Sequence, residues 1–379
     1  MAEIKKIMII CGEPSGDLNA ALLAKKILEI NPQVKISAVG GERLRQASAQ
    51  IFYDIKDISV MGLFDVLKNL PKFITLQKFI LQKISIEKPE AIILVDFSGF
   101  NLRLAKKIKK AIPVFYYVSP QVWASRGGRI KTIKKYISKM IVLFKFEEEF
   151  YKSCGVDAAF LGHPLLDIAK PTMERKKFLD KFLLSASKTT IALLPGSRKQ
   201  EIEHILPVML KASLLIKKKT KDAQFIIAKS SQVGWEIYNR CVHGLDLEVE
   251  IIEAQTYDCL QAADFCLVCS GTATLETAIM QKPFAIIYKM NLFNYLLYRP
   301  QIKVPFIGMV NIVAKRKIIP EFIQFRAKPK NIADEVLKTL QNPSLLERIK
   351  NDLDQVKAGL GEPGASLRAA RLILSFLNT

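Results

Sequence analysis

The chain has 379 residues, half of them hydrophobic, which is enough to bury two cores and excludes an intrinsically disordered protein. Lysine and arginine number 57 against 36 acidic residues, and the net charge of +21 favours contact with polyanions such as phospholipid surfaces or nucleic acids. Six cysteines stand in apolar runs without the spacing of a disulfide framework, as expected of reduced thiols in a cytosol.

The first apolar run, 7–11, is too short for a signal peptide, so we expect a cytoplasmic protein. No charge-free stretch reaches the roughly 20 residues of a membrane-spanning helix, and any membrane contact is therefore predicted to be peripheral.

Short β-rich runs alternate with amphipathic helical patterns, which predicts an α/β protein with two successive parallel sheets covered on both faces. The expected strands are 7–11, 34–39, 91–95, 114–118, 140–143, 190–194, 224–228, 248–252, 265–268 and 284–288. A charged stretch at 164–188 interrupts the rhythm and marks the domain boundary. We expect two Rossmann-like lobes, 1–167 and 188–345, that face a cleft, and C-terminal helices, 346–379, that pack back on the first lobe.

Two motifs of the first lobe follow predicted strands. Gly12-Glu13-Pro14-Ser15-Gly16-Asp17 opens a helix, where free N–H groups favour an anion and Glu13 suits a sugar hydroxyl. A tight turn capped by Ser15 or Asp17 explains the same residues equally well. Asp96 ends the strand 91–95, which is the position of a general base, although a helix cap is as good an interpretation of that residue alone.

Two motifs of the second lobe also follow strands. Leu194-Pro195-Gly196-Ser197-Arg198 adds a guanidinium that can clamp a diphosphate, or else pairs with Glu201 or Glu203 on the surface. Ser270-Gly271-Thr272 lets a phosphate approach a helix N-terminus, and Glu276, one turn further, can accept from ribose hydroxyls. Tight helix–sheet packing explains the glycine but not the glutamate. No spacing predicts a metal site or a cofactor.

Residues 60–86 carry apolar side chains at helical spacing with interleaved lysines. Such a segment either dips into anionic lipid, with Phe64, Phe73 and Leu81 facing the membrane, or is buried against the sheet.

Taken together, these motifs resemble the lipid-A-disaccharide synthase family, inverting glycosyltransferases of the two-lobed GT-B type. The resemblance runs through nearly the whole chain, at 12–17, 39–41, 96–101, 117–124, 146–147, 162–167, 194–198, 270–276, 310–311 and 320–321. It departs from the family where tryptophan is common at Ser125, proline at Ser98 and a residue other than cysteine at Cys269.

The resemblance implies that UDP-2,3-diacylglucosamine donates its sugar to the 6-hydroxyl of 2,3-diacylglucosamine 1-phosphate, giving a β-1,6-linked disaccharide 1-phosphate and UDP. It implies no metal, and a location on the inner face of the cytoplasmic membrane, with the first lobe on the acceptor and membrane side and the second binding the UDP-sugar. Whether the chain forms a homodimer stays open.

By motif position, the resemblance makes Asp96 the catalytic base and Arg198 the ligand of the diphosphate, with Glu276 and Asn311 holding UDP. Glu13 and Ser15 would face the reacting sugars. The other residues expected to bind substrate are Asn101, Gln121, Gly196, Ser197, Ser270, Gly271 and Thr272.

Two alternatives remain. A UDP-sugar epimerase would use Arg198 and Glu276 equally well but would need no acylated acceptor. A nucleic-acid-binding module would explain the charge, yet the chain lacks aromatic platforms interleaved with Lys and Arg.

Overall fold

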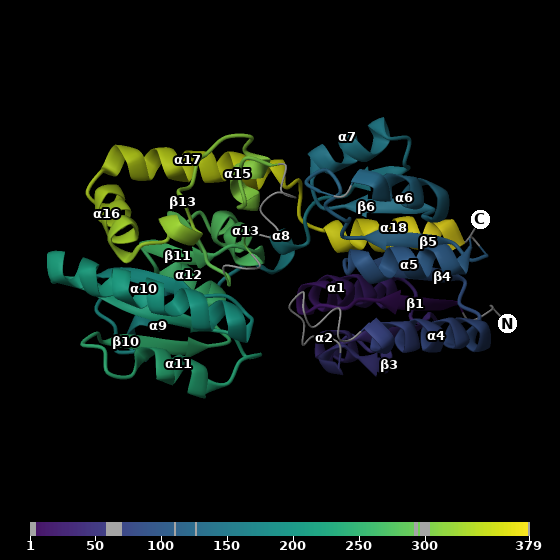
Figure 1. Cartoon of the computed structure of the whole chain (residues 1–379), viewed down its shortest axis with the longest axis horizontal. Coiled ribbons are helices and arrows are strands. Elements are labelled where there is room, and N and C mark those ends of the chain that lie inside the picture. Colours follow the sequence, from purple (N-terminus) through teal and green to yellow (C-terminus); the bar gives the residue numbers. More distant parts are fainter. Residues whose placement is uncertain are drawn as a thin grey trace. The chain divides into compact units, whose positions relative to one another are not determined.

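The computed structural model describes residues 5–57, 70–109, 111–125, 127–291, 295 and 304–377. The chain forms two compact units (Figure 1). The first unit comprises Met1–Pro164 and Leu360–Thr379, and the second comprises Leu165–Gly359.

The described part of the first unit holds a parallel sheet in the order β3-β2-β1-β4-β5-β6-β7. The strands are β1 (Lys6–Ile10), β2 (Lys35–Gly40), β3 (Gln50–Asp54), β4 (Ala91–Val95), β5 (Val114–Tyr117), β6 (Lys139–Val142) and β7 (Ala158–Phe160). All residues of β4 are fully buried, because helices cover both faces of a parallel sheet. That double cover is why the strands are continuous apolar runs in the sequence.

The helices of the first unit form two groups. In one group, α1 (Pro14–Ile30) contacts both α2 (Glu42–Gln46) and α18 (Ala365–Leu377). In the other, α4 (Leu70–Glu87), α5 (Ser98–Ile108) and α6 (Ile130–Tyr136) contact one another in succession, while α7 (Lys145–Ser153) packs on β6 and β7. Two 3₁₀ turns complete the unit, η1 (Ile55–Asp57) and η2 (Gly127–Arg129).

The second unit has a parallel sheet in the order β10-β9-β8-β11-β12-β13 within its described residues. Its strands are β8 (Thr189–Leu194), β9 (Ala223–Lys229), β10 (Val249–Glu253), β11 (Phe265–Cys269), β12 (Phe284–Tyr288) and β13 (Glu321–Ile323). The helices are α8 (Leu165–Ile168), α9 (Arg175–Lys181), α10 (Lys199–Lys219), α11 (Trp235–Val242), α12 (Thr256–Ala262), α13 (Thr272–Ile279), α15 (Met309–Val313), α16 (Pro329–Leu340) and α17 (Pro343–Gly359), with the 3₁₀ turn η4 (Gln324–Arg326).

Each sheet has one point where the strand order reverses direction. In the first unit the chain moves outward from β1 through β2 to β3 and, on the other side, from β4 to β7, so the reversal lies between β1 and β4. In the second unit it lies between β8 and β11. Ligands of open α/β sheets bind at the carboxyl ends of the strands flanking such a point. The fold class predicted from the sequence, two parallel-sheet α/β lobes, is confirmed.

The C-terminal residues divide between the units. Helix α17 contacts α13, α15 and α16 in the second unit, whereas α18 packs along α1 in the first. The return of the last helix to the first unit therefore agrees with the sequence-based expectation.

The segment expected at the membrane is described only from Leu70 onward, and Phe64 lies outside the described residues. In α4, Phe73 and Leu81 are half-buried and pack against the core of the first unit. The ring of Phe73 lies 6.0 Å from that of Phe97 and 6.1 Å from that of Phe100, measured between centroids. The described part of this segment thus packs partly against the core, and its contact with lipid stays a prediction.

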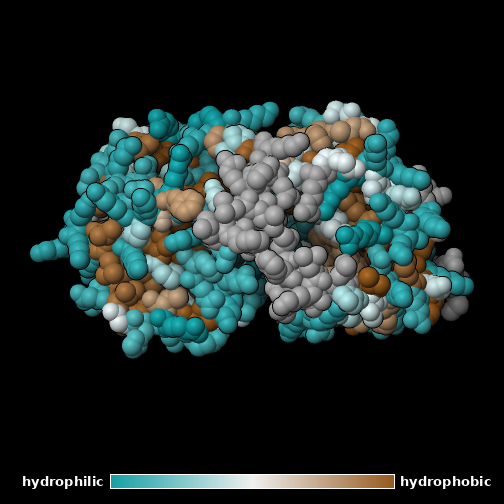
Figure 2. Space-filling model, viewed as in Figure 1, coloured by the Kyte–Doolittle hydropathy of each residue, from teal (hydrophilic) through white to brown (hydrophobic). Residues whose placement is uncertain are grey.

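Among the described residues, no helix is both long and apolar enough to cross a bilayer. The space-filling view shows hydrophilic residues over much of the drawn face of each unit, with apolar patches between them (Figure 2).

Candidate active site

The first strand-end motif begins α1. Glu13 is its N-cap residue with an extended backbone, and Pro14 follows at N1, where its missing N–H costs no helical hydrogen bond. Gly12 lies against the ring of Phe97, and a Cβ there would come within 2.4 Å of it. A Cβ on Gly16 would lie 3.8 Å from the Cβ of Asp96. The two motifs at the reversal between β1 and β4 are thus in contact.

Asp96 follows β4 directly and has a left-handed backbone, with φ of +48°. Three hydrogen bonds hold it: its N–H donates to Tyr117 O at 3.2 Å, and its carbonyl oxygen accepts from Tyr116 Oη at 2.5 Å and Asn101 Nδ2 at 2.9 Å. Such a backbone is unfavourable for most residues and persists where its surroundings impose it. These three bonds thus fix the backbone of Asp96.

Buried neutral groups surround Asp96. Burial raises the pKa of the Cys11 thiol and of the Tyr116 phenol well above their usual values, and the charge of Asp96 raises both further. Both groups are therefore uncharged at neutral pH, which leaves Asp96 facing a medium of low polarizability where its charge acts strongly.

Asp17, the last residue of the first motif, has a structural role. Its carboxylate accepts from the N–H groups of Gly41 at 2.7 Å, Arg43 at 3.1 Å and Leu44 at 3.4 Å, and so caps α2. A Cβ on Gly41 would lie 2.8 Å from Asp17 Oδ2. The glycines that follow β2 thus serve this cap. Ser15, in the first turn of α1, is half-buried, and its carbonyl accepts from Asn19 Nδ2 at 3.1 Å.

Gln121 is exposed, in the loop after β5. The loop is anchored by Glu147, which sequence reasoning had treated only as a landmark. Its buried carboxylate accepts from Ser119 Oγ at 2.9 Å, Trp123 Nε1 at 3.0 Å and the N–H of Leu143 at 3.2 Å. Burial raises the pKa of Glu147, and these donors oppose that rise. Glu147 therefore fixes the loop that carries Gln121.

In the second unit, Gly196, Ser197 and Arg198 connect β8 to α10. Gly196 has φ of +112°, a conformation that favours glycine. The carboxylate of Glu201 accepts from the N–H groups of Ser197 at 3.1 Å and Arg198 at 3.3 Å, and the Arg198 guanidinium, 59% exposed, donates to it at 3.4 Å. Glu201 thus occupies the N–H groups that an incoming phosphate would use.

On the neighbouring strand, Ser270 and Gly271 lead from β11 into α13, whose first residue is the exposed Thr272. Gly271 has φ of +151°, and no heavy atom among the described neighbours lies within 4 Å of a Cβ built on it. Burial raises the pKa of the Cys269 thiol, Glu201 raises it further and Arg198 lowers it. The two turns at the reversal between β8 and β11 therefore lie close enough to interact.

Glu276 is half-buried in α13, and its Oε1 accepts from Tyr257 Oη at 2.8 Å. The sequence did not predict Tyr257, because a hydrogen bond between residues 19 apart in the chain depends on the tertiary structure that brings the first turn of α12 to α13. The hydrogen bond fixes one carboxylate oxygen of Glu276.

Two residues predicted to bind ligand, Asn101 and Asn311, make hydrogen bonds that support the backbone. Asn311 is fully buried, and its Nδ2 donates to Ile319 O at 2.9 Å and Glu321 Oε1 at 2.8 Å, while its Oδ1 accepts from the N–H groups of Ile318 and Ile319 at 2.9 Å each. An asparagine side chain makes about four hydrogen bonds, and all are used here. Contact between Asn311 and UDP stays a prediction, and it would require one of these bonds to be exchanged for a bond to the ligand.

Asn101 is likewise fully buried. Besides Asp96 O, its Nδ2 lies 3.3 Å from Val95 O and 3.4 Å from Ile10 O, so that it ties the ends of β1 and β4 together. Asn101 therefore supports the backbone around Asp96, and its contact with a substrate stays a prediction.

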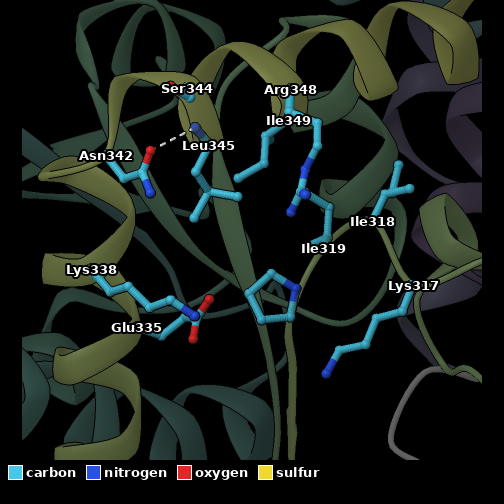
Figure 3. A pocket seen from close by; sticks show the side chains of 11 residues that line it. Lys317, Ile318, Ile319, Glu335, Lys338, Asn342, Ser344, Leu345, Arg348 and Ile349 are labelled. Carbon is cyan, nitrogen blue, oxygen red and sulfur yellow. Dashed lines mark hydrogen bonds between the residues drawn. The ribbon is translucent and has the colours of Figure 1, made fainter.

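A pocket of about 640 Å³ lies elsewhere in the second unit (Figure 3). Lys317, Ile319 and Pro320, which precede β13, line it together with Lys338 of α16 and Arg348 of α17. The amino end of the sheet lies here, opposite the motif-bearing edge, so we place no substrate in this pocket. Across the described residues, no cluster of three or more His, Cys, Asp or Glu side chains is arranged to hold a metal.

Two Rossmann-like parallel-sheet units, each with one reversal of strand order among its described strands, define a GT-B-like fold. The match to solved structures supports this fold: a UDP-GlcNAc 2-epimerase from Neisseria meningitidis bound to UDP-GlcNAc superposes with a TM-score of 0.65. It covers 98% of this chain and 100% of its own at 13% identity, which establishes the fold alone.

The chain belongs to the lipid-A-disaccharide synthetase family, whose model matches residues 7–374. It is 40% identical over 375 residues to a lipid-A-disaccharide synthase of Syntrophus aciditrophicus, covering 98% of each chain. A synthase of Anaeromyxobacter dehalogenans is 38% identical over 376 residues, covering 98% of this chain and 97% of its own. The protein is accordingly a glycosyltransferase of lipid A biosynthesis.

Proposed function

We propose that the chain joins UDP-2,3-diacylglucosamine to 2,3-diacylglucosamine 1-phosphate, forming the β-1,6 disaccharide 1-phosphate and UDP, with Asp96 as the base. The observation that carries this proposal is the full-length family match together with the position of Asp96 and Arg198 at the reversal points of their sheets. The 6-hydroxyl of the acceptor attacks the anomeric carbon of the donor, and its proton passes to the Asp96 carboxylate as the bond to the diphosphate breaks.

The second unit stabilises the leaving group. Negative charge grows on the diphosphate, and the Arg198 guanidinium with the N-terminus of α13 at Ser270–Thr272 supplies fixed positive character. The Arg198 guanidinium is 59% exposed and pairs with Glu201 at 3.4 Å. Exposed ion pairs contribute little to stability, so exchanging this contact for a phosphate costs little free energy. Glu276, oriented by Tyr257, accepts from the ribose hydroxyls.

The remaining exposed or half-buried candidates contact the sugars. Glu13 and Ser15, in the turn that touches Asp96, suit hydroxyl groups of the reacting rings, and Gln121 lies on the loop fixed by Glu147. Asn101 and Asn311 contribute indirectly, by holding Asp96 and Glu321 in place.

Both substrates carry acyl chains, and the enzyme therefore works on the cytoplasmic face of the membrane as a peripheral protein. The supporting observation is a basic face on α5 and α6. Its exposed cations are Arg103, Lys106, Lys107, Lys131, Lys134 and Lys135. None of the six forms an ion pair with another described residue, and each free cation near an anionic surface favours binding by about 1 kcal/mol.

The binding face is tested by flotation with phosphatidylglycerol-containing vesicles. Reversal of Lys106 and Lys107 to glutamate should weaken vesicle binding severalfold more than the same reversal at Lys217 and Lys218 of the second unit. Equal losses in the two variants would show that binding follows net charge and not this face.

The reaction is tested by incubating the protein with the UDP-sugar, with and without the acylated monosaccharide phosphate. UDP release and a disaccharide of the expected mass should depend on the acceptor. An epimerase, the activity of several structural neighbours, would instead alter the sugar nucleotide without any acceptor.

A further inference from the structure

Arg129 belongs to none of the sequence motifs, yet it contacts the helix turn that follows Asp96. It ends η2 and precedes α6. Its Nη1 donates to Ser98 Oγ at 2.8 Å, and its Nη2 lies 4.0 Å from the position of a Cβ on Gly99. Ser98 and Gly99 are the first two residues of α5, directly after Asp96 and Phe97. The guanidinium therefore covers the first turn of the helix that follows Asp96.

The charges of Arg129 and Asp96 act on one hydroxyl group. Tyr116 Oη, fully buried, donates to the backbone oxygen of Asp96. Burial raises the pKa of Tyr116, Asp96 raises it further, and Arg129 lowers it. Because both charges influence the same buried phenol, the guanidinium and the carboxylate flank a common region of low polarity.

Among the described residues, the other titratable groups whose charges act on Cys11 or Tyr116 carry no positive charge. Cys11, directly after β1, Tyr116 of β5 and Tyr151 of α7 are neutral because burial raises the pKa of each, and Asp17 of α1 is an acid that also raises the pKa of Cys11. Within this set, the charge that favours an ionised carboxylate at position 96 comes from Arg129. An opposite charge nearby stabilises the ionised form of an acid, which is the form that accepts a proton.

We propose that Arg129 is a positioning residue of the transferase reaction: it keeps Asp96 ionised and, through its hydrogen bond to Ser98, holds the first turn of α5 in register with that carboxylate. This inference rests on the proposed role of Asp96 as the base. Arg129 makes two contributions, its charge and its contact with Ser98, and different substitutions remove each of them.

The test is the pH dependence of kcat/KM with both acylated substrates in detergent micelles. Arg129→Gln should move the acidic limb of the profile upward by about one pH unit and lower kcat/KM at pH 7 by roughly 10- to 100-fold. Arg129→Lys, which keeps a charge, should restore the limb but only part of the rate. Ser98→Ala should lower the rate less than about tenfold and leave the limb in place.

Arg371→Gln is the matched control, since it removes an exposed guanidinium from α18 of the same unit and should leave the profile unchanged. An unmoved limb in a folded Arg129→Gln variant would overturn the proposal. If circular dichroism shows that Arg129→Gln does not fold, the Ser98→Ala profile decides. An acidic limb shifted by a full pH unit in Ser98→Ala would overturn the separation of charge from contact, and an acidic limb at its wild-type position would support that separation. Retained turnover in Asp96→Asn would instead overturn the base assignment itself.

Discussion

Replacing Asp96 by asparagine isolates the proposed chemical step, because the hydrogen bonds from Tyr116 and Asn101 and the bond to Tyr117 use backbone atoms that the substitution keeps. The bonds from Tyr116 Oη and Asn101 Nδ2 end on the Asp96 carbonyl oxygen, which the substitution leaves in place. Asparagine also tolerates the left-handed backbone at φ of +48°. We therefore expect the free energy of unfolding to change by less than about 1 kcal/mol.

The effect on turnover should be large by comparison. General-base catalysis contributes about 10²- to 10⁴-fold, which corresponds to a barrier higher by roughly 2.7–5.5 kcal/mol. Single-turnover measurement of disaccharide formation with saturating substrates gives the rate, and calorimetric titration with UDP gives the binding control, which should be unaltered.

Asp157→Asn provides the matched substitution. Asp157 is 59% exposed, pairs with Lys139 of β6, and lies far from Asp96 in the sequence. It should retain wild-type turnover. A folded Asp96→Asn protein with a rate within about threefold of wild type would remove Asp96 from the proton transfer and refute the reasoning.

Three further outcomes are expected. Tyr257→Phe removes the donor to Glu276 Oε1 and should weaken UDP binding by up to about tenfold in calorimetry, with little effect on stability. Asn311→Ala removes the partner of the N–H groups of Ile318 and Ile319 and of the C=O group of Ile319, and should lower the free energy of unfolding of the second unit in urea by about 2–4 kcal/mol. A smaller decrease would contradict the structural role of Asn311. Burial lowers the pKa of His163 to about 3, so the folded state stays neutral while the unfolded state gains a proton below about pH 6.5. The free energy of unfolding of the first unit should therefore fall by roughly 1.4 kcal/mol per pH unit between pH 6 and 5. Unfolding is followed by the fluorescence of Trp123 in a Trp235→Phe background, and the pH dependence should be weaker in His163→Gln.

The regular framework could be predicted closely. All ten strands expected from the sequence are present within one residue at each end, because strands buried on both faces leave continuous apolar runs. The three strands that were not predicted, β3, β7 and β13, all lie at sheet edges and are partly exposed. An edge strand is stabilised by its neighbour more than by its own composition, so its sequence carries a weaker signal.

The candidate site was predictable in part. The turns at Glu13, Asp96, Arg198 and Ser270 were recognised because each follows a strand, and chain order alone places the carboxyl ends of parallel strands at one edge. The roles of Asn101 and Asn311 were not predictable in the same way, since the residue type suits both ligand contact and backbone support. The burial of these side chains and their hydrogen bonds to the backbone show the support, which the sequence alone does not.

The sequence by itself determined the α/β class, the position of the strand-end turns and, through the family resemblance, the reaction. Tertiary structure decided which side chains act on those turns: Tyr257 reaches Glu276, Glu147 holds the loop of Gln121, and Arg129 reaches the turn after Asp96. The physical reason is the difference between distance along the chain and distance in space. Hydrophobic periodicity and turn chemistry are local in the chain, whereas hydrogen bonds and electrostatic interactions depend on separations in space that only the packing of helices on the sheets establishes.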